Sequence, residues 1–148
     1  MNYINQENTT RILAIDYGDS KIGFAISDLM KIIAKPYKTI KNKSFVSVIN
    51  NIQDIIIEKS IEKIIIGLPI TLNNTFSEQT KKVEDFANKL ESKINVPLLK
   101  YDERLSSLQA KRSMITQGIK TGHNKEIIDM TAAAIFLQSY LDEQSNTK

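Results

Sequence analysis

The chain of 148 residues contains no cysteine and a single histidine. Without cysteine it can form neither a disulfide framework nor a thiolate metal site, a composition compatible with a reducing compartment. No apolar run approaches the roughly 20 residues of a membrane-spanning helix, and the first ten residues are polar. The sequence therefore predicts a cytoplasmic protein with no membrane segment.

The rest of the composition is that of an ordinary globular protein, with 41% hydrophobic and 25% charged residues. A chain of this length can bury one well-formed core, so we expect a single domain. We place that domain at residues 11–141, between a polar N-terminal tail of residues 1–10 and a polar C-terminal tail of residues 142–148.

The net charge is only +3, but basic residues are segregated along the chain. No acid lies between Asp28 and Asp54 or between Glu103 and Glu126, and each interval contains several lysines or arginines. Such segregation is typical of a rim that binds a polyanion, although solvated lysine faces are also common. The candidates for nucleic-acid contact in these intervals are Lys35, Lys38, Arg104, Lys111 and Lys120.

The most informative segment is an apolar run that ends in a carboxylate and a glycine. Residues 12–15 are apolar and precede Asp16, and a second apolar run follows at residues 22–26. This pattern predicts a β-hairpin whose first strand is buried on both faces and ends near Asp16. A buried strand tolerates an ionised side chain only at its end, where water, a metal or a phosphate compensates for the lost solvation. The alternative is an Asx-turn in which Asp16 supports the bend at Gly18.

Three further strands are predicted from short apolar runs, at residues 32–40, 63–67 and 96–101. Pro36 interrupts the first of them and so favours an edge position. In this arrangement the first, fourth and fifth strands of the sheet run parallel. Their carboxyl ends then emerge along one edge, where ligands of open α/β sheets tend to bind.

Four helices are predicted from apolar residues at helical spacing. Two begin behind caps at Ser44 and near Ser77, and each presents an apolar face to the sheet. The third is expected from Ser106 or Ser107 to Gln117, and the last from about Glu126 to Leu141. The element order predicts an α/β domain built on a five-stranded mixed sheet.

Four carboxylates lie where this arrangement could bring them together. Asp16 ends the first strand, and Asp129 lies on the last helix. Asp102 and Glu103 follow the fifth strand. Carboxylates from separate elements repel unless a divalent cation lies between them, and oxygen ligands select Mg²⁺ or Mn²⁺. Two such ions about 4 Å apart would promote phosphodiester hydrolysis. The alternative leaves Glu103 and Arg104 in surface pairs and Asp129 on a solvated helix face.

The chain also resembles the YqgF (RuvX) family in four motifs that occur in the same order. They are Asp-x-Gly with Ile-Gly-x-Ala-x-Ser-Asp within residues 16–28, Ile-Gly-Leu-Pro at 66–69, Asp-Glu-Arg-Leu-Ser at 102–106, and Ile-Asp-x-x-Ala-Ala at 128–133 with Leu-Gln-Ser-Tyr-Leu at 137–141. The resemblance covers nearly the whole chain. It implies an RNase H-like fold, with helices on both faces of the sheet. It also implies a nuclease that matures the 5′ end of pre-16S ribosomal RNA, or a Holliday junction resolvase.

The resemblance also implies roles for individual residues. By motif position, Asp16 is the catalytic aspartate of the first strand and Asp129 that of the last helix. Glu103 or Asp102 is the second carboxylate, with Asp16, Glu103 and Asp129 expected to ligate the metal. Lys21 stands where arginine is usual, so it keeps a charge for phosphate but loses the bidentate fork.

Two further departures from the family pattern are Tyr17, where proline is frequent, and Asn74, near a common glycine. The only histidine, His123, directly follows Gly122 and is expected on a surface loop.

Two other functional classes share features of this sequence. Actin-like ATPases open with a similar hairpin, but their fold needs two such lobes. A nucleic-acid-binding module without turnover would be weakened by unbridged acids near phosphate. We therefore expect a metal-dependent endonuclease that uses Mg²⁺ or Mn²⁺ and acts on precursor ribosomal RNA rather than branched DNA. We expect a monomer or weak homodimer, because no apolar heptad indicates a dimer interface.

Overall fold

A computed structural model describes residues 9–70, 77–106 and 125–146, with only the backbone described for 125–131 and 146. One sheet contains five strands in the order β3-β2-β1-β4-β5. The strands are β1 (Arg11–Tyr17), β2 (Lys21–Ser27), β3 (Ala34–Lys41), β4 (Ile61–Leu68) and β5 (Leu98–Asp102). β1, β4 and β5 run parallel, whereas β2 is antiparallel to β1 and β3. The predicted five-stranded mixed sheet is therefore confirmed.

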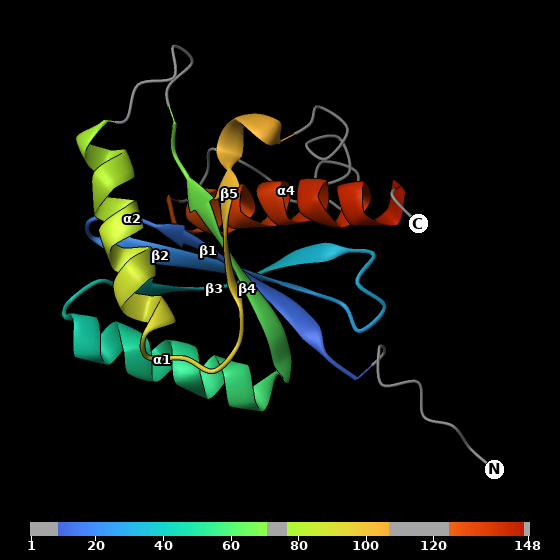
Figure 1. Cartoon of the computed structure of the whole chain (residues 1–148), viewed down its shortest axis with the longest axis horizontal. Helices are drawn as coiled ribbons and strands as arrows, with labels where there is room; N and C mark the ends of the chain where they lie inside the picture. Colours follow the sequence, from blue (N-terminus) through green and yellow to red (C-terminus); the bar gives the residue numbers. More distant parts are fainter. Residues whose placement is uncertain (1–8, 71–76, 107–124, 147–148) are drawn as a thin grey trace.

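Helices cover both faces of this sheet. α1 (Phe45–Glu58) and α2 (Glu78–Glu91) lie on one face, and α4 (Lys125–Asn146) crosses the other (Figure 1). A single 3₁₀ turn, η2 (Glu103–Leu105), follows β5 directly. No helix in these described segments is long and apolar enough to cross a membrane.

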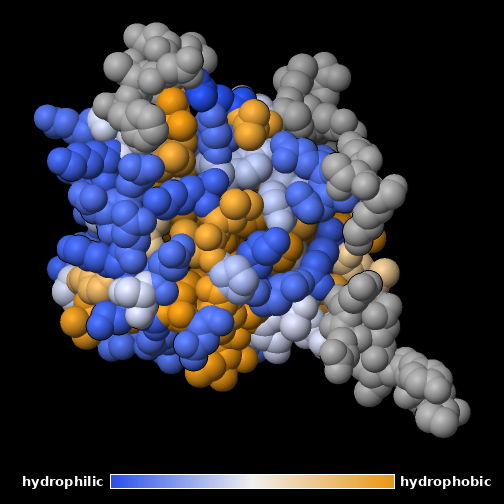
Figure 2. Space-filling model, viewed as in Figure 1, coloured by the Kyte–Doolittle hydropathy of each residue, from blue (hydrophilic) through white to orange (hydrophobic). Residues whose placement is uncertain are grey.

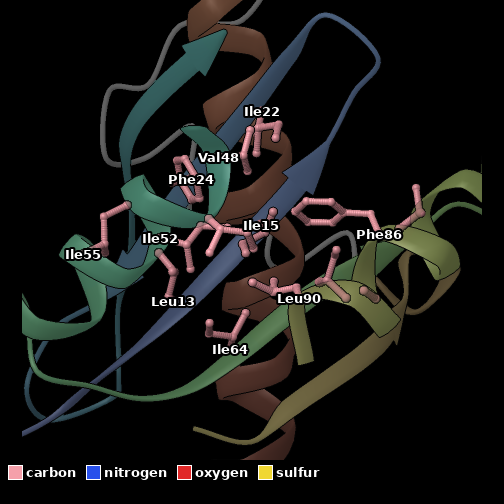
Figure 3. Close-up of a cluster of buried hydrophobic side chains, with 14 of the residues drawn as sticks. Leu13, Ile15, Ile22, Phe24, Val48, Ile52, Ile55, Ile64, Phe86 and Leu90 are labelled. Carbon is pink, nitrogen blue, oxygen red and sulfur yellow. The ribbon is translucent and has the colours of Figure 1, made fainter. Parts of the chain in front are cut away.

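The central strand β1 contributes to both hydrophobic clusters because its side chains alternate between the two faces. Leu13 and Ile15 pack in the cluster beneath α1 and α2, and Ile12 and Ala14 pack beneath α4. Figure 3 shows the first cluster, gathered from β1, β2, β4, α1 and α2, with α4 behind the sheet. Burial on both faces explains why the sequence of this strand is apolar at four successive positions.

Both predicted helix caps are present. The hydroxyl of Ser44 accepts a hydrogen bond from the backbone N–H of Ser47 (3.2 Å), and Ser77 does the same for Thr80 (3.2 Å). Thr80 is itself buried and donates to the carbonyl of Pro69, which ties α2 to the end of β4. An N-cap of this kind contributes about 1 kcal/mol to stability.

Strand β3 is an edge strand, as Pro36 predicts, but it begins at Ala34 rather than residue 32. Asp28 accepts hydrogen bonds from the N–H groups of Ile32 (2.8 Å) and Ile33 (2.9 Å), so these residues belong to a closed turn. Gln138 of α4 accepts from the N–H of Ala34 (2.9 Å) and donates to the carbonyl of Ile32 (2.8 Å). This buried amide fixes the β2–β3 connection to the last helix.

The last helix is longer than the apolar pattern indicates. The helix extends to Asn146, beyond the expected end at Leu141, where its apolar residues stop. Polar contacts stabilise these turns instead: Asp142 accepts from Gln138 (3.0 Å), and Glu143 accepts from Tyr101 (2.7 Å). The helix predicted from Ser106 or Ser107 to Gln117 lies almost entirely outside the described residues.

Candidate active site

Asp16 lies one residue before the end of β1, on the face of the sheet that α4 covers. The alternation along the strand establishes this, because Ala14 packs beneath α4 while Tyr17 packs on the opposite face. On β2, Asp16 is paired with Gly23, which has no side chain to place beside the carboxylate. The strand end therefore presents one acid on the α4 face.

Glu103 reaches the neighbouring strand from the turn that follows β5. Its Oε1 lies 2.6 Å from the position that a Cβ atom on Gly67 would occupy, and the Cε2 of Phe136 on α4 lies equally close at 2.6 Å. Gly67 has no side chain, and the Glu103 carboxylate and the Phe136 ring fill the space above it. The absence of a side chain at Gly67 is thus a condition for the position of Glu103.

Asp16 and Glu103 lie at the same end and on the same face of the sheet. β1 and β4 are paired at Ile15 and Ile66, so Asp16 and Gly67 are the next residues on adjacent strands. Adjacent strands lie about 4.8 Å apart, and the Glu103 oxygen stands above Gly67. The two carboxylates thus converge at the edge where the parallel strands end.

The Glu103 carboxylate is half-buried, and its burial raises its pKa; the neighbouring charge of Asp102 raises that pKa further. Ionising a carboxylate there is costly unless a cation compensates. Oxygen ligands on separate elements suit a divalent cation, so the donor set fits such an ion. No group of three or more His, Cys, Asp or Glu residues forms a metal site in the described part of the chain. The third predicted ligand, Asp129, has only its backbone described, four residues before buried Ala133 on α4.

Asp102 has a different environment from Glu103. Its Oδ1 accepts the N–H of Arg104 (2.9 Å) and caps η2, and its Oδ2 pairs with the Arg104 guanidinium at 2.6 Å. These hydrogen bonds with Arg104 hold the pKa of Asp102 below its ordinary value. Because Tyr101 packs beneath α4, alternation directs Asp102 to the other face. Of the two predicted carboxylates, only Glu103 accompanies Asp16.

Contacts with α4 fix the turn that carries Glu103. The hydroxyl of Tyr101 lies 3.1 Å from Ser139 Oγ and 2.7 Å from Glu143 Oε1, and Ser139 donates to the carbonyl of Leu105 (3.0 Å). Burial is the main cause that raises the pKa of Tyr101 to about 12. Neither Ser139 nor Glu143 was expected at the site, although Ser139 belongs to a family motif.

The predicted basic residues do not all lie near the carboxylates. Lys21 is the first residue of β2 and lies on the α4 face, directly opposite Lys41 on β3. Lys41 was not among the predicted contacts, but the hairpin register would have indicated it, because Ile22 and Ile40 pair on the other face.

The other basic candidates lie elsewhere or beyond the described residues. Lys38 stands over the ring of Tyr37 at 5.7 Å, and that ring packs against the cluster beneath α1. Lys35 pairs with Ile26 at the far end of the sheet. Arg104 is held by Asp102 at the carboxylate edge. The structural description does not include Lys111, Lys120 or His123.

Comparison with known proteins identifies the family of the chain. The sequence model of the RuvX family, described as Holliday junction resolvase, matches residues 10–143. A protein of Caldanaerobacter subterraneus subsp. tengcongensis, named as a candidate pre-16S rRNA nuclease, is 43% identical over 139 residues, covering 93% of this chain and 99% of its own. A protein of the same name from Ruminiclostridium cellulolyticum is 41% identical, covering 93% and 98%.

Among solved structures, Thermus thermophilus RuvC is similar in fold, with a TM-score of 0.62 over 93% of this chain and 98% of that one, at 11% identity. Identity this low shows the shared fold alone. The sequence relatives and the family match cover almost the whole domain and go further. The chain belongs to the RuvX family, a family of nucleases with an RNase H-like fold.

Proposed function

We propose that the protein is a metal-dependent endonuclease in which Asp16, Glu103 and Asp129 hold Mg²⁺ or Mn²⁺ at the carboxyl end of β1 and β4. The observation that carries this proposal is the position of Glu103 Oε1 above Gly67, next to Asp16 on the α4 face. Asp129 is included because it precedes Ala133 by four residues and Phe136 by seven, spacings that share one helix face.

The residues around the carboxylates would each have a part in hydrolysis. Asp16 and Glu103 would bind the ion, which supplies an activated water and neutralises charge on the phosphodiester. Lys21 and Lys41 would attract the phosphate backbone to the same face. Asp102 and Arg104 would hold the turn in place rather than react, because each is engaged by the other at 2.6 Å.

We propose precursor 16S ribosomal RNA, cut near its 5′ end, as the substrate, and the cytoplasm as the location. The names of the sequence relatives support the substrate, and the absence of cysteine supports a reducing compartment. Cutting one strand needs one site, so a monomer or weak homodimer suffices. Figure 2 shows a hydrophilic surface over α2, at the left, and an apolar area at the centre and bottom of the same view.

Resolution of Holliday junctions is the second candidate. The description of the family model favours it, and the fold is shared with RuvC. Two symmetric cuts require two sites related by a two-fold axis, hence a dimer. Four of the exposed apolar residues in the described segments lie together in the β2–β3 connection, at Leu29, Met30, Ile32 and Ile33, and Val46, Ile57, Leu99 and Leu105 are exposed elsewhere. That connection lies at the opposite end of the sheet from Asp16.

Cleavage of both substrates side by side separates the two functions. Purified protein is incubated in Mg²⁺ and in Mn²⁺ with a 5′-extended 16S precursor fragment and with a four-way DNA junction, alongside Glu103→Gln as the control for contaminating nucleases. We expect cleavage of the RNA at one position and little cutting of the junction. Paired symmetric nicks in the junction, with an intact RNA, would favour resolution instead. If neither substrate is cleaved, the remaining interpretation is a nucleic-acid-binding protein without nuclease activity.

A further inference from the structure

We propose that a cavity on the other face of β1 binds one unpaired nucleotide of the substrate strand, with its base against Tyr17 and its phosphate at Lys82 and Lys89. This inference rests on the proposed nuclease function, because it assigns a neighbouring subsite to the same strand. The cavity lies between the end of β1, the start of α1 and the exposed side of α2.

The cavity has a volume of about 240 Å³ and combines rings with charged groups. Its lining residues are Tyr17, Asn42, Phe45, Lys82, Asp85, Phe86 and Lys89. Pockets that enclose a drug-sized ligand measure roughly 300–1,000 Å³, so this one suits a single ring system with its attached groups.

Three aromatic rings form the wall of the cavity. Tyr17 and Phe86 are stacked, with centroids 4.4 Å apart and planes inclined by 30°. Phe45 meets Phe86 edge-on at 6.1 Å. Phe86 is buried, whereas Tyr17 and Phe45 are half-buried and present part of their rings to the cavity. Every nucleobase has a π-face that can stack on such rings, so this contact does not depend on the sequence of the nucleic acid.

Charged groups at the rim of the cavity can bind the phosphate and the polar groups of a nucleotide. Lys89 Nζ lies 5.8 Å from the centroid of Phe45, and Lys82, which is largely exposed, lies 3.5 Å from Asp19. Both ammonium groups can meet a phosphate without leaving the rim. Asp85, the one acid in the lining, would repel phosphate, but it can accept hydrogen bonds from a base amino group or a ribose hydroxyl.

The cavity is placed to hold the strand that crosses the carboxylates. Tyr17 follows Asp16 directly on β1, and their side chains point to opposite faces of the sheet at the same end. A single strand that passes around this end therefore meets the carboxylates on one face and the aromatic wall on the other. The side-chain amide of Asn42 donates a hydrogen bond to the carbonyl of Gly18 (3.0 Å) and fixes the turn between β1 and β2.

The chain contains no tryptophan, so Tyr17→Trp introduces a single fluorescent reporter in the cavity wall. The matched control is Tyr37→Trp. Tyr37 is also half-buried and has Lys38 and Lys59 over its ring at 5.7 and 5.5 Å, but it lies on β3 outside the cavity. Titration with single-stranded RNA in EDTA measures binding without cleavage. We expect quenching of Tyr17→Trp and unchanged fluorescence of Tyr37→Trp.

Affinity measurements test the same contact without a fluorophore. Tyr17→Ala should bind the RNA about 5- to 100-fold more weakly, the effect of removing one base–aromatic stack. Lys89→Ala, which leaves the stacked rings in place, should lower the slope of log affinity against log salt by roughly 0.7. One abasic position in the RNA should weaken binding to the wild type and leave binding to Tyr17→Ala unchanged.

Three outcomes would overturn the inference. RNA that binds without quenching Tyr17→Trp, and without any position-specific abasic effect, does not enter the cavity. Quenching by a free mononucleotide but not by the RNA would make this a small-molecule site. Equal quenching at Tyr17→Trp and Tyr37→Trp would indicate a non-specific response. Because all titrations contain EDTA, they stay readable even if the proposed cleavage activity is absent, so the two failures are distinguishable.

Discussion

The Glu103 carboxylate occupies the space that a side chain on Gly67 would need: its Oε1 lies 2.6 Å from the position of that missing Cβ atom. Real Cβ contacts are essentially never this short, so glycine at this position is what allows the carboxylate to stand beside Asp16. The Phe136 ring closes the same space from α4 and keeps the carboxylate at the sheet edge.

Replacing Gly67 by alanine therefore tests whether the position of Glu103 matters for activity. The added methyl group must displace both the carboxylate and the Phe136 ring, and overpacking of this kind lowers the free energy of unfolding by about 1–3 kcal/mol. We expect Gly67→Ala to remain folded but to lose most cleavage. Denaturant unfolding and single-turnover cleavage measure the two effects.

The control is the double variant Gly67→Ala with Phe136→Leu. The smaller side chain gives the methyl group room and should recover part of the lost stability. If the single variant retains full cleavage, the position of Glu103 above Gly67 is not required for activity.

The raised pKa of Glu103 predicts an unusual effect on stability. A carboxyl group whose pKa is higher in the folded than in the unfolded state makes stability fall as pH rises from its unfolded to its folded pKa. At neutral pH the ionised group is therefore destabilising. Because glutamine carries no charge, we expect Glu103→Gln to raise the Tm of the metal-free protein.

In Mg²⁺ we expect the wild type to have a higher Tm than Glu103→Gln. The ion binds the folded wild type and stabilises it by mass action, whereas Glu103→Gln lacks one ligand and should respond little. Calorimetry with and without EDTA measures both effects. A lower Tm for metal-free Glu103→Gln than for the wild type would contradict the view that the ionised Glu103 carboxylate destabilises the metal-free fold.

Asp102 should behave in the opposite way to its neighbour. Its pKa is lowered by Arg104, so its contribution to stability is present above the unfolded pKa and is lost as pH falls through the folded pKa. Asp102→Asn keeps a side chain that can cap η2 but loses the partly exposed ion pair, which should cost less than about 1 kcal/mol. Acid unfolding should become less steep.

Cleavage by Asp102→Asn should stay within a few-fold of the wild type, while Glu103→Gln should be inactive. The comparison uses the same RNA and Mg²⁺ concentration for both. Loss of activity in Asp102→Asn alone would show that the wrong member of this pair has been assigned to the site.

The basic residues should divide by the face on which they lie. If Lys21 and Lys41 attract the phosphate backbone, Lys21→Ala and Lys41→Ala should each lower the slope of log affinity against log salt by roughly 0.7–0.9. Lys35→Ala and Lys38→Ala serve as matched controls, because both residues lie on the same edge strand as Lys41, and they should leave the slope unchanged. Identical slopes for all four variants would mean that Lys21 and Lys41 are solvated without contacting phosphate.

Most of the fold could be predicted from the sequence because local signals and the global arrangement agree. The apolar run before Asp16 indicates the central strand, Pro36 indicates the edge, and Ser44 and Ser77 indicate the helix starts. The end of α4 could not be predicted from apolar spacing, because its final turns are held by polar contacts such as that between Tyr101 and Glu143.

The site was predictable only in part. The sequence indicates that Asp102 and Glu103 follow a strand, but which of them faces α4 depends on the exact residue at which β5 ends. The role of Gly67 depends on a contact with Glu103, 36 residues further along the chain, and no local pattern reveals it. Lys41 was overlooked because its partner Lys21 is known only from the hairpin register.

Single-turnover cleavage of the 5′-extended precursor by Asp16→Asn tests the carboxylate pair most directly. The wild type, Asp16→Asn, Glu103→Gln and the double variant are compared in Mg²⁺ after circular dichroism has shown that each is folded. Ligands of one site act as a unit, so we expect each single variant to lose nearly as much rate as the double variant. Full residual cleavage by Asp16→Asn would contradict the proposal and remove Asp16 from the mechanism.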